Sequence, residues 1–194
     1  MVAKGEVHEK DGRLWFNGEL IVYAQKPDKI RIERDLTKFE RGRFFTSEIY
    51  NGGKGWIIRN LIPNYRDELA GQYKAKLDRC EGIAFHANHA DALTLTGEEE
   101  IEGKAAYTIE ALSGNAKSTL YIDKESFYLV KEAYDNVTLH YSDFKELGNA
   151  IRAGKILEVT EGRRTVEVTY TYNTIELDAD IDPTLFEEDM PSGT

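Results

Sequence analysis

The 194-residue sequence has a single cysteine, Cys80, and only four prolines. It contains no apolar run long enough to cross a bilayer as a helix, so we expect no transmembrane segment. One cysteine excludes an intramolecular disulfide and a thiolate metal cluster, and it leaves the redox compartment open. Basic residues are also few: 25 Lys and Arg stand against 35 Asp and Glu, which gives a net charge of −10. Because nucleic acids and anionic membrane surfaces bind basic patches, we expect neither as a partner.

The acidic surplus is concentrated toward the C-terminus. Residues 176–189 contain seven Asp and Glu and no Lys or Arg. The first six residues, Met-Val-Ala-Lys-Gly-Glu, contain no apolar signal core. We therefore expect either a cytoplasmic chain or one from which a targeting segment has been removed.

Short segments with alternating apolar and polar residues follow one another along the chain. The alternation is cleanest after residue 92, as at Tyr107 and Ile109 or in residues 166–172. Turn residues separate these segments at steps of about 10 to 14 residues, which leaves no room for the helical crossovers of a parallel sheet. No linker rich in Pro, Gly or Ser divides the chain. We predict one mainly β (α+β) domain over residues 1–194, built on a strongly curved antiparallel sheet of about 10 to 12 strands.

One segment departs from this alternation and predicts a helix. Its apolar residues recur at helical spacing: Tyr65, Leu69, Tyr73, Leu77 and Cys80. This pattern predicts one amphipathic helix of about four turns that covers the apolar face of the sheet. Asn64 is the expected N-cap and Gly82 the expected stop. A short second helical turn is expected at residues 183–188, where Pro183 takes a first-turn position.

Two segments partly match metal-binding loops. Residues 86–91, His-Ala-Asn-His-Ala-Asp, would converge on one ion if they were helical, but no further ligand lies at a suitable spacing. Residues 178–189 begin like a calcium loop, yet Pro183 stands where its sharp turn needs Gly. We expect a solvated loop and an acidic edge instead, and no bound metal.

Catalytic motifs are absent from the sequence. There is no G-x-S-x-G elbow, glycine-rich phosphate loop, H-E-x-x-H or G-x-G-x-x-G pattern. Cys80 lies on the apolar stripe of the expected helix, where a small buried side chain is favoured over a reactive thiol. A small enzyme would need a buried Glu or Asp that faces a His, and the sequence shows no such pairing. We expect no enzymatic activity and no cofactor.

A one-layer curved sheet of this length encloses more volume than one helix can fill. Two outcomes stay open: large aromatic side chains fill the interior, or part of it remains as a hydrophobic cavity for an apolar ligand. Alternation and helical spacing select the candidate ligand-binding residues, which are Phe16, Val22, Ile32, Phe45, Leu69, Tyr73, Leu77, Tyr107, Ile109, Ile122 and Tyr128.

Several stretches, in their order and spacing, resemble the outer-membrane lipoprotein-sorting family, the LolA/LolB-like group. They are residues 23–33 (YAQKPDKIRIE), 50–56 (YNGGKGW), 97–103 (GEEEIEG), 120–125 (LYIDKE), 141–144 (YSDF) and 182–186 (DPTLF). The first is similar to the family's strand and K-P-[ND]-K turn, and the second resembles its D-G-K-x-x-W hairpin. Together they cover most of residues 14–190.

This resemblance implies an open β-barrel, or half-barrel, closed by a helical lid over a hydrophobic cavity. It implies a monomeric, non-enzymatic carrier of a lipid or of a lipoprotein's acyl chains, in the periplasm or at the periplasmic face of the outer membrane. It also implies an Arg that holds the lid, for which Arg34 and Arg43 are candidates. The family's signal sequence and first helix are expected to be absent from this chain.

A second hypothesis belongs to a different class. Some LolA-like relatives are interaction modules that sense a segment of a partner protein in the cell envelope, and the same fold would serve that role here. Co-purifying lipid distinguishes the carrier from the sensor.

Overall fold

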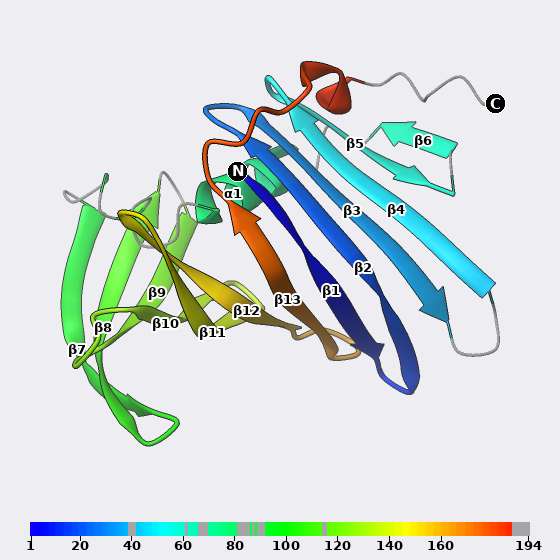
Figure 1. Ribbon diagram of the computed structural model, residues 1–194. Coiled ribbons are helices and arrows are strands. Elements are labelled where there is room, and N and C mark those ends of the chain that lie inside the picture. Colours follow the sequence, from blue (N-terminus) through cyan, green and yellow to red (C-terminus); the bar gives the residue numbers. More distant parts are fainter. Residues whose placement is uncertain are drawn as a thin grey trace. The chain divides into compact units, whose positions relative to one another are not determined.

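The computed structural model describes residues 1–38, 42–60, 62–65, 70–80, 86, 88, 92–113 and 116–187 (Figure 1). The strands are β1 (Val2–Asp11), β2 (Leu14–Gln25), β3 (Lys29–Lys38), β4 (Gly42–Asn51), β5 (Lys54–Arg59), β6 (Ile62–Tyr65), β7 (Leu93–Ile101), β8 (Lys104–Ser113), β9 (Ala116–Asp123), β10 (Leu129–Tyr134), β11 (Val137–Leu147), β12 (Ala150–Thr160) and β13 (Val166–Glu176). The α-helix α1 spans Ala70–Arg79, and the 3-10 helix η3 spans Pro183–Phe186. No helix among the described residues has the length and apolarity that crossing a membrane requires.

The strands form one mainly antiparallel sheet, as the short turns predicted. The order is β6-β5-β4-β3-β2-β1-β13-β12-β11-β10-β9-β8-β7, so consecutive strands are neighbours except where β13 lies between β1 and β12. Among the described strands the sheet is not closed, because β6 and β7 are its two edges. The described residues form thirteen strands rather than the predicted 10 to 12, and the alternation did not single out β1, β6, β11 and β12.

The chain consists of two compact units. Unit 1 contains residues 1–9, 14–80 and 170–194, and unit 2 contains residues 10–13 and 81–169. Helices α1 and η3 belong to unit 1, whereas β7 to β12 belong to unit 2. The single domain expected from the sequence stays a prediction.

Glycine permits a close approach between neighbouring strands, and one example from each unit shows how close it is. A Cβ atom on Gly18 in β2 would lie 1.9 Å from the carbonyl oxygen of Asp35 in β3. A Cβ on Gly154 in β12 would lie 2.4 Å from the carbonyl oxygen of Asp143 in β11. A Cβ atom at either point would clash with the backbone of the neighbouring strand, so only glycine fits there.

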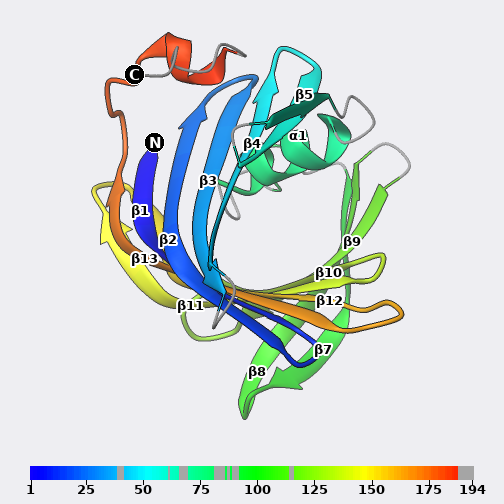
Figure 2. The same cartoon turned by 90° about the vertical axis from the view of Figure 1, so that its right-hand side faces the viewer.

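The two faces of the unit 1 sheet are covered by different elements. Val22, Ile32 and Glu48 are register partners across β2, β3 and β4, and they share the face on which α1 packs. Figure 2 shows the α1 coil beside β4 and β5. Ile49 and Trp56 belong to the opposite face, where they form a buried cluster with Ile58. Strands β4 and β5 are therefore buried on both faces, unlike strands with one solvated face.

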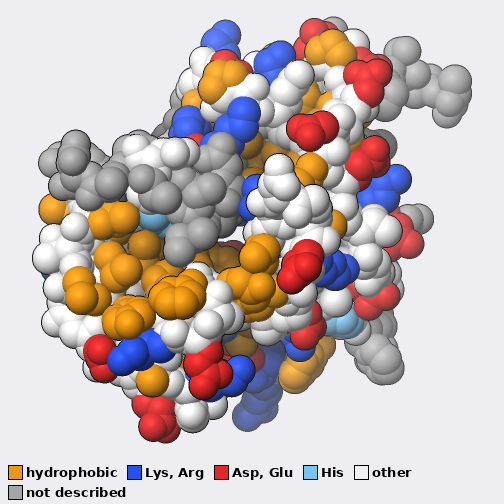
Figure 3. All heavy atoms as spheres, turned by 60° about the vertical axis from the view of Figure 1, so that its left-hand side comes forward, with side chains coloured by type: hydrophobic (Ala, Val, Ile, Leu, Met, Phe, Trp, Pro, Cys, Tyr) orange, Lys and Arg blue, Asp and Glu red, His pale blue; other side chains and the backbone are white. Residues whose placement is uncertain are grey.

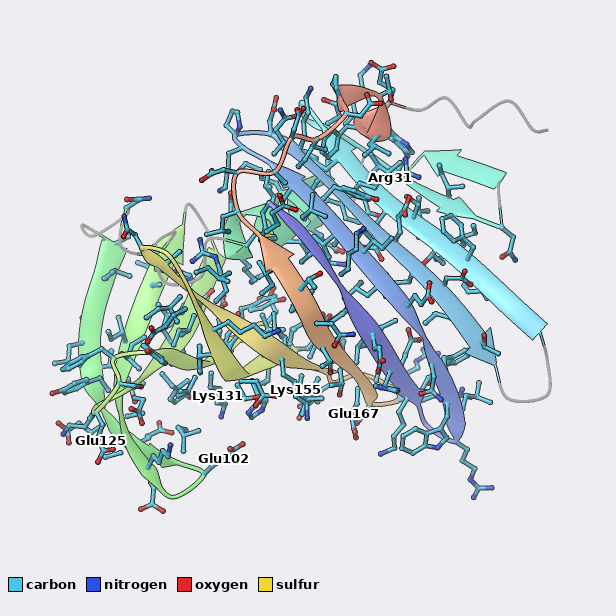
Figure 4. The ribbon with its side chains drawn as sticks, in the orientation of Figure 1. Arg31, Glu102, Glu125, Lys131, Lys155 and Glu167 are labelled. Atoms are coloured by element: carbon cyan, nitrogen blue, oxygen red, sulfur yellow. The ribbon has the colours of Figure 1, made fainter. Side chains whose placement is uncertain are left out.

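The 3-10 helix η3 packs on the face opposite α1, and its Phe186 side chain is 0% exposed. Arg31 donates from Nη1 to the Leu185 carbonyl oxygen at 2.9 Å, at the η3 end of β3 (Figure 4). Asn51 donates from Nδ2 to the Phe186 carbonyl oxygen at 3.1 Å. Asp182 caps η3, because its Oδ1 accepts from the Thr184 backbone nitrogen at 2.9 Å, and this hydrogen bond lowers the pKa of the Asp182 carboxyl.

These contacts confirm the predicted helical turn after Asp182 and correct the predicted main helix. Residues expected to begin that helix, Asn64 and Tyr65, lie instead in β6, where they pair with Ile57 and Trp56 of β5. Asn64 is therefore not a helix cap. The helix α1 has ten residues rather than about four turns. The expected stop, Gly82, lies outside the described residues.

Candidate functional site

Helix α1 rests on β3, β4 and β5 through its buried side chains Tyr73 and Leu77. The contact is close at Gly55 in β5, where a Cβ atom would lie 3.0 Å from Cδ2 of Tyr73 and 3.2 Å from Cα of Ala70. The absence of a side chain at Gly55 therefore lets the helix approach the sheet. Lys76 and Arg79 lie in the last turn of α1, where cations interact favourably with the helix dipole.

Two glycine-to-alanine substitutions are expected to act in opposite directions on this contact. Gly55→Ala should destabilise the protein by about 1–3 kcal/mol, because the new methyl group overpacks the interface with α1. Gly71→Ala should stabilise it by up to about 1 kcal/mol, because Gly71 is an exposed helical residue with no atom near a new Cβ. Urea unfolding of both variants measures the difference. Equal stability of the two variants would contradict the close packing of α1.

A buried ion cluster links α1 to the sheet. Arg34 in β3 donates from Nη2 to Oε1 of Glu48 in β4, and Lys76 of α1 lies with Nζ 2.6 Å from Oε2 of Glu48. The side chain of Glu48 is 8% exposed, so its charge is largely removed from water. A buried carboxylate requires such partners, because desolvation disfavours an unpaired charge. Glu48 thus holds one cation of the sheet and one cation of the helix.

Unit 2 presents an apolar face that extends over five strands. One row of register partners crosses it: Leu95 in β7, Ile109 in β8, Leu120 in β9, Glu132 in β10 and Leu139 in β11. Ala111, Leu120, Ile122 and Leu129 form its buried cluster, and Leu93, Tyr107, Ile109 and Tyr141 pack against it while they remain partly exposed. Figure 3 shows hydrophobic side chains gathered on unit 2, on the left of that view. Leu95 is 63% exposed at the β7 edge of this face.

A buried carboxylate interrupts this apolar face. Glu132 is 1% exposed, and its Oε2 accepts a hydrogen bond from the Tyr141 hydroxyl at 3.0 Å. Nε2 of His86 lies 4.0 Å from the same oxygen, and His86 is also buried. The structure therefore contains the carboxylate–histidine pairing that sequence reasoning did not find. The two residues belong to distant segments, and only the alternation of Glu132 with Lys131 and Ala133 could have indicated that it faces inward.

The opposite face of unit 2 contains cationic side chains and a histidine. Lys131 lies with its Nζ 4.7 Å from the centroid of the Tyr121 ring, and His140 is the register partner of Lys131. Partial burial and the Lys131 charge lower the pKa of His140, an effect that Glu102 opposes. Figure 4 labels Lys131 and Lys155 on the strands of this unit. Cations and a half-buried imidazole make this face unsuited to an acyl chain.

Comparison with solved structures identifies the fold. A LolA superfamily protein from Nitrosomonas europaea superimposes with a TM-score of 0.65 at 13% identity, covering 96% of this chain and 89% of that protein. An outer membrane lipoprotein-sorting protein domain from Vibrio parahaemolyticus gives a TM-score of 0.57 at 10% identity, with coverages of 95% and 88%. A DUF1329 family protein from Desulfovibrio piger gives 0.60 at 11% identity, with coverages of 96% and 89%.

The chain has a LolA-like fold. No protein-family model matches the sequence, and a sequence search finds no curated relative. At such low identity the structural likeness establishes the fold of this chain and does not identify the residues of a binding site.

In unit 1 of this LolA-like fold, most of the predicted ligand-binding residues lie either in α1 or on the face of the sheet on which α1 packs. Val22 and Ile32 are register partners on the α1 face, and the alternation of β2 places Phe16 on that face too. Tyr73 and Leu77 belong to α1 itself. Phe45 lies on the opposite face. It pairs with Asp35, the residue after Arg34, and successive residues of a strand alternate between the two faces. Leu69 lies outside the described residues.

In unit 2, Tyr107, Ile109 and Ile122 lie together in the apolar cluster of that unit. Tyr128 is not part of this cluster. Its ring instead packs against Phe144, with the ring centroids 4.7 Å apart. Three of the four candidates in this unit therefore share one apolar surface.

The remaining expectations from the sequence concern single side chains. Of the two arginines expected to hold the lid, Arg34 reaches α1 indirectly through Glu48, and the side chain of Arg43 lies outside the described residues. Of the residues that would form a metal loop, His86 contacts Glu132, and residues 89 and 91 are not described. Cys80 is half-buried, and its thiol donates a hydrogen bond to the Lys76 carbonyl oxygen at 3.4 Å.

Proposed function

We propose that the chain binds and carries, without catalysis, a lipid or the acyl chains of a lipoprotein, in the periplasm or at the periplasmic face of the outer membrane. The observation that carries this proposal is the apolar cluster of unit 2, around which Leu95 is exposed and Leu93, Tyr107, Ile109 and Tyr141 remain partly exposed. Contiguous exposed apolar surface on a folded protein marks a binding site. The LolA-like fold, which the chain shares with an outer membrane lipoprotein-sorting protein domain, supports lipid as the ligand.

The driving force in this proposal is the burial of the acyl chain against apolar side chains. Each buried CH₂ group contributes about 0.8 kcal/mol, so about a dozen carbons supply roughly 10 kcal/mol before the costs of ordering. Association and ordering costs leave an affinity in about the micromolar range. The half-buried residues Tyr107, Ile109 and Tyr141 would provide the contact area.

Leu95→Glu is expected to weaken the binding of a fluorescent fatty acid by about tenfold or more. The substitution removes apolar contact area and places a charge at the edge of the acyl-binding face. Because Leu95 is 63% exposed, the variant should fold normally. Fluorescence titration gives the affinity.

The matched control is Leu112→Glu, which alters an exposed leucine in the neighbouring strand β8. Leu112 is 47% exposed and follows Ala111, the register partner of Leu93, so it belongs to the opposite face of the sheet. Its substitution should leave the affinity unchanged. Equal losses in the two variants would contradict binding on the face that contains Leu95.

Native mass spectrometry of the purified protein tests the nature of the ligand. A carrier should retain lipid, seen as a discrete mass increment that is lost from the Leu95→Glu variant. A module that binds a protein segment would show no lipid and no affinity for the fatty acid, and that result would exclude the carrier function.

A further inference from the structure

The α1 face of unit 1 contains two buried polar atoms that have no hydrogen-bond partner among the described residues. One is Oγ1 of Thr46 in β4, a residue that is only 6% exposed. The other is Nε of Arg34 in β3. Thr46 precedes Glu48 by two residues, so it shares the face on which Lys76 of α1 reaches Glu48. Folded proteins retain few such atoms, and each one requires an explanation such as a bound ligand.

The sheet register brings these two groups together. Thr46 is the direct register partner of Arg34, and side chains that are directly opposite have Cβ atoms about 4.5–5.5 Å apart. Arg59 in β5 is the register partner of Thr46 on its other side, and it is exposed to solvent. A row of three polar residues thus runs from the buried interior to the solvent.

The chemistry of this row selects a ligand with acceptor oxygens. The Nε of arginine can only donate a hydrogen bond, and a threonine hydroxyl can donate one. Arg34 and Arg59 carry two positive charges in this row, and Glu48 supplies one negative charge beside Arg34. In a protein whose net charge is −10, this local cationic surplus favours an anion.

Apolar residues flank the row on the same face. Leu20, the register partner of Arg34 in β2, is buried. Leu36 and Phe44 pair on one side of the row, and Val22 and Ile32 pair on the other. A ligand bound here would have an oxygen-rich head among the polar groups and an apolar chain beside them.

We infer that Arg34 and Thr46 form a head-group subsite, and that the ligand is an amphiphile with a carboxylate or phosphate head. This inference rests on the proposed function only in that the ligand is a lipid, and it names the class of lipid that the protein prefers. The subsite and the apolar residues beside it lie wholly in unit 1 and form a site separate from the apolar face of unit 2. The two unpaired donors bind the head-group oxygens, and Arg59 supplies long-range attraction at the solvent side.

The experiment compares three ligands with the same chain: hexadecanoate, hexadecyl phosphate and hexadecanol, each titrated against an apolar fluorescent probe. The protein should bind at least one of the anionic ligands about tenfold or more tightly than hexadecanol, because hydrogen bonds to charged groups are the stronger ones. Preference for the phosphate alone identifies a phospholipid head, and preference for the carboxylate identifies a fatty acid.

Thr46→Val tests the subsite without removing a structural contact. The substitution keeps the shape of the side chain and deletes a hydroxyl that has no hydrogen-bond partner among the described residues, so the stability of the free protein should not fall. The preference for the anionic ligand should fall by about 3–10-fold. The matched control is Ser47→Ala, which deletes a second unpaired buried hydroxyl from the opposite face of β4 and should leave the preference unchanged.

Three outcomes would overturn the inference. If hexadecanol binds as tightly as both anionic ligands, or if Thr46→Val and Ser47→Ala behave alike, the subsite is excluded while the carrier function stands. If inorganic phosphate displaces hexadecyl phosphate at equal concentration, the site binds a free anion rather than a lipid. If none of the long-chain ligands binds, the proposed function fails and this inference fails with it.

Discussion

Replacement of Glu48 by Gln is expected to destabilise the protein by about 3–5 kcal/mol, the largest loss that we expect from a polar substitution in this chain. The carboxylate of Glu48 contacts Arg34 and Lys76 and is 8% exposed. Removal of its charge leaves the largely buried guanidinium of Arg34 without a counter-charge, and an unpaired buried charge is costly. The free energy of unfolding in urea measures the loss.

A double variant separates the ion pair from the packing around it. Arg34→Met combined with Glu48→Met removes both charges, so it should recover most of the stability lost in Glu48→Gln. Lys76→Met should cost only up to about 1 kcal/mol, because the side chain of Lys76 is partly solvated. If the double variant is less stable than Glu48→Gln, the charges are not the source of the loss.

Phe186→Ala should destabilise the protein by about 3–5 kcal/mol. The ring is completely buried on the face of β3 and β4 opposite α1, and its removal would leave a cavity in addition to the lost transfer free energy. The hydrogen bonds that the Arg31 and Asn51 side chains donate to the backbone carbonyls of η3 depend on the same docking. Thermal and urea unfolding both report on this change.

The neighbouring residue provides the control for this prediction. Leu185 is half-buried in the same 3-10 helix, so Leu185→Ala should cost about 1 kcal/mol. A similar loss in both variants would mean that η3 as a whole, rather than the Phe186 ring, stabilises this face.

Local sequence pattern predicted α1 only in part. Tyr73 and Leu77 are four residues apart and bury the same stripe, so their helical spacing was informative. Tyr65 fitted the same spacing, yet it lies in β6, where it pairs with Trp56 of β5. A short segment that contains an aromatic residue and a β-branched residue suits either structure, and pairing with β5 decided between them.

The polar residues of the site were not predictable from their neighbours in the sequence. Arg34, Glu48 and Lys76 look like solvated charges in alternating or amphipathic segments, and they meet only because β3 pairs with β4 and α1 packs over both. His86 and Glu132 also lie in separate segments that tertiary structure brings to within 4.0 Å. The apolar residues Tyr107, Ile109 and Ile122 were predictable, because alternation alone assigns them to one face.

The amino-acid sequence by itself determined an antiparallel, mainly β protein with an amphipathic helix and a capped turn after Asp182, because alternation, turn residues and caps act over a few neighbouring residues. Tertiary structure alone decided which face each element covers, that β4 and β5 are buried on both faces, and that buried charges lie on the sheet face that α1 covers. The physical reason is that burial depends on what packs above a side chain, and those contacts join residues far apart in the chain.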